Sequence, residues 1–200
     1  MRGTGWRVCI LAMLLLVGAP VLAAPELVFD ISENGLEILD SQLTVFQDPS
    51  ARMTIGEVVE ADRQERFRLV TSKDLLPGYT RDAIWASISL RNGSSVQQRR
   101  FIEVTPPRLR NIHLFMPENN GWSSAVSGIS IPVKERLIQT RRPTFTIDLA
   151  PGEIQKIYIR VESGNAIVLS VRLWKPDAFY MHTNKIDFIN GVQFGAVFLF

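Results

Sequence analysis

The sequence predicts an all-β sandwich, in the jelly-roll form, with one short helix. Apolar and polar residues alternate over several short runs, and turn-forming residues separate these runs at short spacing. Alternation with a period of two is typical of a strand that turns one face toward a core. Many such strands with one brief helix indicate two packed sheets, with a jelly roll as the preferred form.

The clearest strands are predicted to form a β-meander in the middle of the chain. Residues 84–91 alternate best, and the Asn-Gly pair at 92–93 tolerates the positive φ of a turn that reverses the chain. Residues 101–105 form the return strand, which ends at the Pro-Pro pair 106–107 because proline cannot donate to a ladder. Residues 109–116 alternate again as a third strand.

The segments before the meander are predicted to contain two strands and the helix. Residues 26–31 and 35–46 are the opening strands, and Asp-Pro-Ser at 48–50 stops the extended run. Thr54 and Glu57 have the spacing of a capping box, which predicts a short helix with Ile55, Val58 and Val59 on one face. We expect this helix to cover one end of the core.

After the meander, residues 117–128 are predicted to be a loop in which Trp122 is the single large side chain. Residues 129–142 show no clear periodicity. Three further strands are predicted at 144–149, 154–162 and 167–174. Their core faces are expected to consist of Phe145, Ile147, Leu149, Ile157, Ile159, Val161, Ile167, Leu169, Val171 and Leu173.

Residues 1–23 are predicted to be a cleavable signal peptide. Arg2 and Arg7 precede an apolar run, and small residues follow that run, as at a secretory cleavage site. We therefore expect residues 24–183 to form a periplasmic domain. Residues 184–200 are expected to be a juxtamembrane segment with the start of a first transmembrane helix, which would anchor the domain in the inner membrane.

Charge and cysteine content exclude some partners and crosslinks. The formal net charge is +2, and the predicted signal peptide contributes two positive charges, so the mature chain is close to neutral. This balance argues against nucleic acid as a partner. Cys9 is the single cysteine and lies in the predicted signal peptide. The mature protein is therefore expected to have no disulfide.

Two interpretations of the C-terminal segment stay open. Residues 192–200 contain one polar side chain, but this run is far shorter than the ~20 residues a helix needs to cross a bilayer. The chain either enters a first transmembrane helix here or ends as a small outer-membrane β-barrel protein does, at Phe200. The predicted strands are near or below the ~9–11 residues of a barrel strand, which favours the first interpretation.

The sequence contains no recognisable catalytic or metal-binding motif. There is no GxSxG, HExxH, CxxC or phosphate-binding glycine-rich loop. His113 and His182 are the only histidines, and neither has metal-ligand spacing to a partner. We therefore expect no catalytic residue, no metal and no cofactor. Carboxylates that folding brings together leave a secreted jelly-roll enzyme acting on polysaccharide as an alternative function.

The outward faces of three predicted strands, with the adjoining loop, carry the candidate ligand-binding residues. Aromatic rings stack on sugars, while arginine and serine bind hydroxyls or carboxylates. If these strands share a sheet, they form one surface for a carbohydrate or a small anionic ligand. Alternatively, the tryptophans cover the sheet edge and the arginines are solvated. The candidates are Trp85, Arg136, Tyr158, Arg160, Arg172 and Trp174.

Short motifs in a fixed order resemble the type-2 extracellular domain of bacterial seven-transmembrane receptors with diverse intracellular signalling modules (7TMR-DISM). The most distinctive is a glycine before a Trp-led strand that ends in Arg-Asn, WASISLRN at 85–92. The other matching segments are 45–50 with its DPS element, 53–59, Gly78-Tyr79, 109–115, 128–132, Arg136, 151–153, 158–161 and 173–176. The resemblance covers nearly all of the predicted mature chain.

This resemblance implies a periplasmic jelly roll, similar to carbohydrate-binding modules, that senses a ligand ahead of seven membrane helices. In the family those helices lead to a diguanylate cyclase, a histidine kinase or another output module. The chain would then be the non-enzymatic sensor portion of a longer receptor. The expected partners are a small-molecule or carbohydrate ligand, the membrane through the C-terminal segment, and a second copy of the chain in a homodimer.

Overall fold

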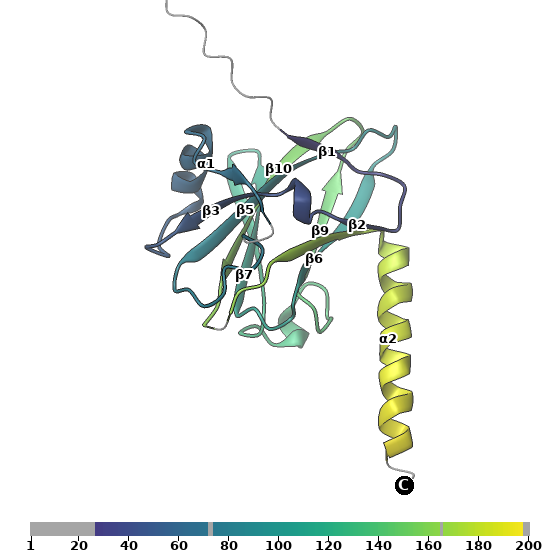
Figure 1. Ribbon diagram of the computed structural model, residues 1–200. Coiled ribbons are helices and arrows are strands. Elements are labelled where there is room, and N and C mark those ends of the chain that lie inside the picture. The colour runs from purple at the N-terminus through teal and green to yellow at the C-terminus, as the bar shows by residue number, and fades with distance from the viewer. Residues whose placement is uncertain (1–26, 72–73, 165, 198–200) are drawn as a thin grey trace, which may run out of the picture.

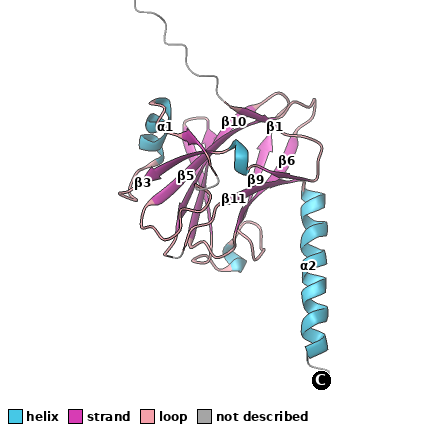
Figure 2. Cartoon of the chain, viewed as in Figure 1, coloured by secondary structure: helices cyan, strands magenta, loops and turns pink. Residues whose placement is uncertain are grey.

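The protein is a sandwich of two β-sheets from which one long helix projects (Figures 1 and 2). This computed structural model describes residues 27–71, 74–164 and 166–197. The predicted all-β sandwich is confirmed, whereas its jelly-roll form stays a prediction. The predicted signal peptide, 1–23, lies outside the described residues.

The larger sheet has seven strands in the order β4-β3-β5-β10-β7-β8, with β1 parallel to β5. Its other neighbours are antiparallel. The strands are β1 (Val28–Asp30), β3 (Thr44–Asp48), β4 (Arg68–Leu69), β5 (Ala83–Arg91), β7 (Asn111–Glu118), β8 (Gly121–Ser127) and β10 (Ile154–Glu162).

The smaller sheet has four antiparallel strands in the order β2-β11-β6-β9. These are β2 (Leu36–Ile38), β6 (Gln98–Thr105), β9 (Thr144–Leu149) and β11 (Ser170–Trp174). The helical elements are the 3-10 turns η1 (Asp40–Gln42) and η2 (Val133–Glu135) and the α-helices α1 (Ile55–Arg63) and α2 (Pro176–Val197).

The main core lies between the sheets and contains every apolar residue predicted for it. Ile84, Ala86, Ile88 and Leu90 of β5 meet the ten predicted residues of segments 144–149, 154–162 and 167–174. Each fully buried Ile, Leu, Val or Phe contributes about 2 kcal/mol relative to exposure. Two-residue periodicity therefore identified the inner faces correctly.

The predicted β-meander is wrong, because its three strands do not pair with one another. β5 and β7 belong to the larger sheet, whereas β6 belongs to the smaller one, so the chain crosses the sandwich twice. Alternation reveals which face of a strand is buried but not which strand lies beside it. The connection at 92–97 crosses between the sheets, which are about 10 Å apart in sandwiches.

Asn92 stabilises that crossing through its side chain. It is completely buried, and its Nδ2 donates hydrogen bonds to the carbonyl oxygens of Val96, Leu149 and Ala150 at 2.8–3.0 Å. Its Oδ1 accepts from the backbone N–H of Ser94 at 3.0 Å. The positive φ predicted for the Asn-Gly pair is not used here, because Gly93 is not among the glycines with positive φ.

Residues 117–128, predicted to be a loop, instead contain the edge strand β8. It pairs with β7 from Ile112↔Ser127 to Glu118↔Gly121. β8 is rich in glycine and serine, so its sequence lacks the apolar alternation that reveals a strand. Trp122 on β8 is half-buried, because it packs on the ring of Tyr158 with centroids 5.2 Å apart.

Helix α1 begins at the predicted capping box. The Thr54 side chain accepts from the N–H of Glu57, and the Glu57 carboxylate accepts from the N–H of Thr54. The helix does not cover an end of the core, as expected from the sequence, but the outer face of the larger sheet. There Val58 and neighbouring apolar residues pack over Phe46 and Trp85 in a second apolar cluster. The expected position was wrong because amphipathicity specifies a buried face without specifying its partner.

Asp48 shapes the turn that leads into α1. Its carboxylate accepts hydrogen bonds from Ser50 N, Ser50 Oγ and Met53 N at 2.6–3.0 Å. Burial raises the pKa of Asp48, but these hydrogen bonds outweigh burial and hold the pKa below its ordinary value. The DPS element is therefore a turn stabilised by an ionised carboxylate.

Helix α2 starts against the smaller sheet and then extends beyond the sandwich (Figure 1). Phe179 is 1% exposed, and its ring meets those of Phe101 at 5.3 Å and Trp174 at 6.1 Å between centroids. The helix begins at Pro176, inside the range predicted for the periplasmic domain. Among the described residues, no helix combines the length and hydropathy required of a membrane span.

We expect Gly128→Ala to destabilise the fold by about 3 kcal/mol, measured by urea unfolding. Gly128 has φ +118°, and an added Cβ would lie 2.3 Å from the carbonyl oxygen of Arg110. Gly93→Ala is the matched control, because its Cβ would meet nothing within 4 Å. Equal urea midpoints for the two variants would contradict this account of the turn.

We expect Asp48→Asn to reduce the loss of stability at acid pH. Because the folded-state pKa of Asp48 is depressed, its contribution is present above about pH 4 and is lost as the pH falls through the folded value. The variant should be less stable than wild type at neutral pH and closer to it at low pH. Parallel urea curves with a constant gap at every pH would contradict the assignment.

Candidate functional site

The structure divides five of the six predicted ligand-binding residues between opposite sides of the sandwich, and the sixth, Arg136, lies in the loop between β8 and β9. β5 and β10, which carry Trp85, Tyr158 and Arg160, share the larger sheet. β11, which carries Arg172 and Trp174, lies in the smaller sheet, so the assumption that all three strands share a sheet is wrong. These five residues therefore cannot form one continuous surface.

The residues on the larger sheet are packed beneath α1. Trp85 is completely buried and stacks on Phe115 with centroids 5.4 Å apart. Tyr158 is 2% exposed, and its hydroxyl donates to Asp62 of α1 at 2.5 Å. The Arg160 guanidinium lies 5.6 Å from the Trp85 ring centroid and donates to the Ala51 carbonyl at 2.7 Å. This group holds the helix onto the sheet.

His113 lies next to this packed group. Its ring stacks on Phe115 with centroids 6.0 Å apart. Burial lowers the pKa of His113, and the positive charge of Arg160 lowers it further. His113 is therefore held neutral near physiological pH, as a packing residue of the outer face.

Arg136 organises the segment between β8 and β9. Its guanidinium donates to the carbonyl oxygens of Gly128, Ile131, Thr140 and Arg141 at 2.8–3.2 Å. The side chain is buried, and these acceptors lie at both ends of the segment 128–141. Arg136 therefore closes this segment into a fixed loop.

Glu103 lies at the centre of the outer face of the smaller sheet, on β6. It is 1% exposed, and its Oε1 accepts a hydrogen bond from Nη1 of Arg142 at 3.1 Å. Nη1 of Arg172 lies 3.7 Å from the same oxygen. Two guanidinium groups therefore share one carboxylate, which leaves an excess positive charge close to the sheet surface.

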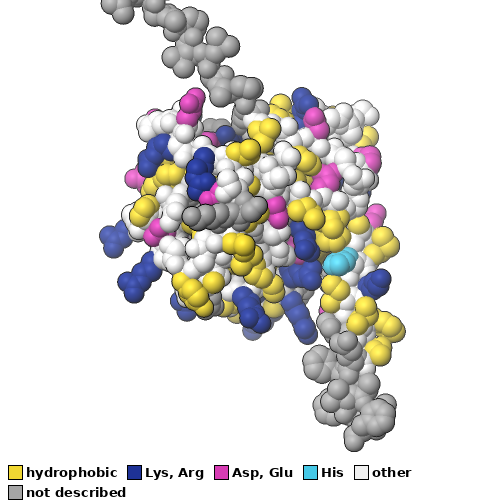
Figure 3. Space-filling model, in the orientation of Figure 1, with side chains coloured by type: hydrophobic (Ala, Val, Ile, Leu, Met, Phe, Trp, Pro, Cys, Tyr) yellow, Lys and Arg dark blue, Asp and Glu magenta, His cyan; other side chains and the backbone are white. Residues whose placement is uncertain are grey.

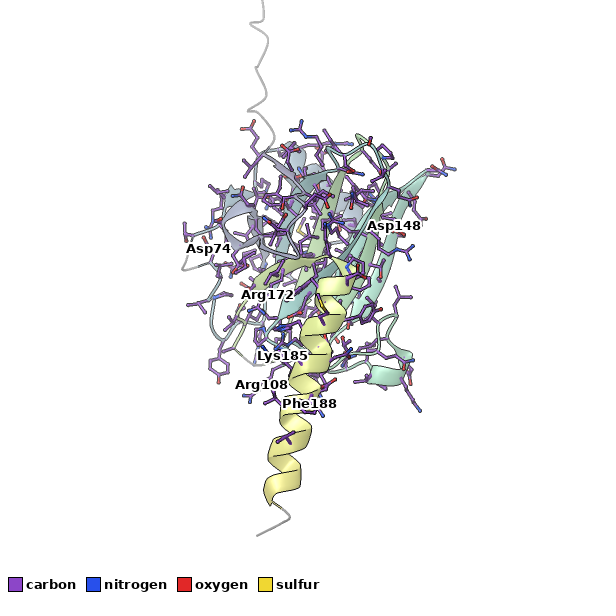
Figure 4. All side chains as sticks on the ribbon, turned by 90° about the vertical axis from the view of Figure 1, so that its right-hand side faces the viewer. Asp74, Arg108, Asp148, Arg172, Lys185 and Phe188 are labelled. Atoms are coloured by element: carbon purple, nitrogen blue, oxygen red, sulfur yellow. The ribbon has the colours of Figure 1, made fainter. Side chains whose placement is uncertain are left out.

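Trp174 and His182 connect this charge cluster to α2. Nε2 of His182 lies 3.5 Å from Nη1 of Arg142, and the His182 ring meets that of Trp174 with centroids 4.9 Å apart. The sequence-predicted pair Arg172 and Trp174 thus lies at the base of α2. Figure 4 shows Arg172 beside the helix, with Lys185 and Phe188 further along it.

Hydrogen-bonding capacity is left over in this cluster. Within the described part of the chain, Oε2 of Glu103, Nε of Arg172 and Nε1 of Trp174 are buried without a hydrogen-bond partner. Buried polar atoms in folded proteins normally have partners. The cluster shares this feature with Nε1 of Trp85 and Nε of Arg160 beneath α1, and it differs from Arg136, whose guanidinium donates to four nearby carbonyls.

A groove of about 630 Å³ runs beside this cluster, between α2 and the loop closed by Arg136. This volume lies in the range of small-molecule sites. Arg142 belongs both to the groove wall and to the Glu103 cluster. The groove is lined by Pro107, Val133, Gln139, Thr140, Arg141, Arg142, Phe179, Thr183, Ile186 and Asp187.

None of the residues that line the groove was among the candidates predicted from the sequence, although two signals pointed to this region. Arg141 and Arg142 stand in a segment without periodicity, which is typical of a loop that carries function. Glu103 stands in the middle of an apolar strand, where a charge has a specific partner. Nothing in the local sequence of α2 indicated that this helix forms a wall of the groove, because its position depends on the direction in which the chain leaves β11.

The two sheets and the groove at the base of α2 define an all-β sandwich domain with a ligand-sized site. Within the described residues, no group of three His, Cys, Asp or Glu side chains could hold a metal ion. The chain matches the family described as 7TMR-DISM extracellular 2 over residues 40–175, and it belongs to this family. It is therefore an extracytoplasmic sensor domain of a membrane receptor, as the sequence motifs predicted.

Comparison with curated proteins gives no match. Among solved structures, the chain is similar to the functional form of the mosquito-larvicidal Cry4Aa toxin from Bacillus thuringiensis, with 12% identity and a TM-score of 0.28. That match covers 47% of this chain and 19% of the toxin chain. A likeness this slight supports no conclusion about fold or function.

We expect Arg136→Lys to destabilise the domain by about 3 kcal/mol, because an ammonium cannot reach four carbonyl oxygens that a guanidinium fork bridges. The exposed neighbour Arg141 provides the control, Arg141→Lys, which should leave the unfolding midpoint unchanged. Proteolysis within segment 128–142 should also accelerate in the first variant alone. If both variants unfold at the same urea concentration, Arg136 does not close the loop.

Proposed function

We propose that the domain senses a small carbohydrate or anionic ligand in the groove between α2 and the 133–142 segment. The observation that carries the proposal is that Arg142 lines this groove while sharing Glu103 with Arg172. A ligand carboxylate at Arg142 would balance the excess positive charge of that cluster. Charge-assisted contacts of this kind are stronger than neutral hydrogen bonds.

The walls of the groove fit a ligand with both polar and apolar faces. Gln139 and Thr140 offer hydrogen bonds to hydroxyls, and Phe179 and Ile186 offer apolar surface to a ring. A sugar acid has this combination of groups. Uronic acids are therefore the first ligand class to test, with neutral sugars as the comparison.

Ligand binding would reach the rest of the receptor through α2. A ligand in the groove would contact both walls, and one of them is the helix that leaves the domain. A ligand shifts such an equilibrium only as far as its affinity differs between the two helix positions. The proposed receptor is anchored in the inner membrane after signal-peptide removal and controls a diguanylate cyclase or histidine kinase, without enzymatic activity in this domain.

The proposal is tested by titrating the purified chain with galacturonate, glucuronate, galactose and glucose in a calorimeter. We expect a uronate to bind and Arg142→Gln to weaken it by about 1.5–3 kcal/mol, the range of a hydrogen bond to a charged group. Arg63→Gln is the control, since Arg63 is an exposed residue of α1 outside the groove lining. Binding that survives Arg142→Gln unchanged would place the site elsewhere.

A further inference from the structure

One end of the sandwich gathers loops with a strong excess of basic residues. Strand register places the loops 78–82, 106–110 and 128–143 at the same end. Asn111, which follows loop 106–110, pairs with Glu162 next to the start of β5, and β5 follows loop 78–82. Thr144, which follows loop 128–143, pairs with Glu103 near the end of β6, where loop 106–110 begins. We call these three loops the basic end. Figure 3 shows Lys and Arg side chains along this lower edge of the molecule, beside α2.

The basic side chains of this end are exposed and unneutralised. Within the described part of the chain, none of the five forms an ion pair or a side-chain hydrogen bond. The same loops contain two carboxylates: Glu135 is exposed, and Asp82 is half-buried and accepts a hydrogen bond from Gln47. The opposite end differs, because its loops 92–97 and 150–153 contain no lysine or arginine. The charge is therefore polarised along the sandwich. The five residues are Arg81, Arg108, Arg110, Lys134 and Arg141.

Exposed apolar side chains alternate with these charges. Tyr79 is 83% exposed and Leu137 is 76% exposed, and Ile129 and Val133 in the same loops are also exposed. A soluble polyanion gains nothing from such apolar loop tips. A lipid surface does, because apolar and aromatic side chains enter the headgroup region while lysine and arginine bind the anionic headgroups.

Helix α2 leaves the sandwich at this end. Ile186 and Asp187 still lie beside Pro107 and Val133 at the groove, and the remaining turns project past the loops (Figure 1). Phe188, Ile189 and Val192 on these turns are exposed apolar residues. Figure 4 shows Arg108 at the same end, next to the helix.

A hollow of about 640 Å³ opens at the same end. Tyr79, Arg81, Arg110 and Asn111 contribute to its lining, so basic and aromatic residues border a space large enough for a phosphate headgroup. Glu162, which also lines the hollow, is paired with Arg160.

We infer that the basic end is a docking surface for an anionic phospholipid membrane. It sets the sandwich upright on the bilayer, with the loops 78–82, 106–110 and 128–143 against the headgroups. The contact is electrostatic with shallow apolar insertion. It therefore weakens with salt, as the Debye length shortens. The inference is independent of which ligand occupies the groove.

The test measures binding of the full chain to phosphatidylcholine vesicles with and without phosphatidylglycerol. Each basic residue near an anionic surface contributes about fivefold in affinity, so Arg108→Gln with Lys134→Gln should weaken binding to the anionic vesicles about 30-fold. Arg63→Gln with Arg66→Gln removes the same charge from the α1 region and should leave binding unchanged. Segments 1–26 and 198–200 are common to all samples, so the differences report on the basic end.

A second measurement locates the contact without depending on charge. In a Cys9→Ser background, an NBD fluorophore on Leu137→Cys should shift to the blue with anionic vesicles, whereas the same label on Ala150→Cys, at the opposite end, should not. Equal affinity of both double variants, equal binding to neutral vesicles, or equal shifts of both labels would overturn the inference. So would tighter binding to dextran sulfate in solution than to the vesicles, which would assign the basic end to a soluble polyanion.

Discussion

Strand β5 is buried on both of its faces, and the rest of the structure is arranged to cover it. Eight consecutive residues, 83–90, are buried. The inner set meets the smaller sheet, and the outer set, which includes Trp85, requires a second cover. Helix α1 supplies that cover. β5 is thereby covered on both sides, and the groove at the base of α2 lies against the smaller sheet.

Several polar residues that could be interpreted as ligand contacts instead form hydrogen bonds with the backbone groups of loops. Asn92, Asp48 and Arg136 each bond three or more backbone or side-chain groups near their own loop. A buried N–H or C=O without a partner is costly, so a chain that crosses repeatedly between two sheets needs such residues at its crossings. Their hydrogen bonds therefore serve folding, whereas the Glu103 cluster retains buried polar atoms without a hydrogen-bond partner among the described residues.

The sequence was sufficient to predict which face of each strand is buried, but not which strands pair with one another. Alternation placed Ile84, Ile157 and Leu173 in the core correctly, and the Thr54 capping box located the start of α1. Pairing could not be predicted, because β5, β6 and β7 alternate equally well in one sheet or in two. Because strand pairing could not be predicted, the candidate site was predicted as one surface although its residues lie apart. Trp85 and Trp174 have similar local patterns, but Trp85 lies under α1 and Trp174 lies at the base of α2. That difference arises from contacts distant in sequence.

The packing of Phe179 gives α2 the mechanics of a lever. The helix is held at this residue by Phe101 and Trp174, touches the groove near Ile186, and continues to Val197. At 1.5 Å per residue along the helix, Ile186 at the groove lies about 10 Å from Phe179, and Val197 lies about 27 Å from Phe179. A tilt that moves Ile186 by 1 Å therefore moves the end of the helix by about 2.6 Å. Side-chain adjustments at the sandwich become displacements on the scale of half a helical turn.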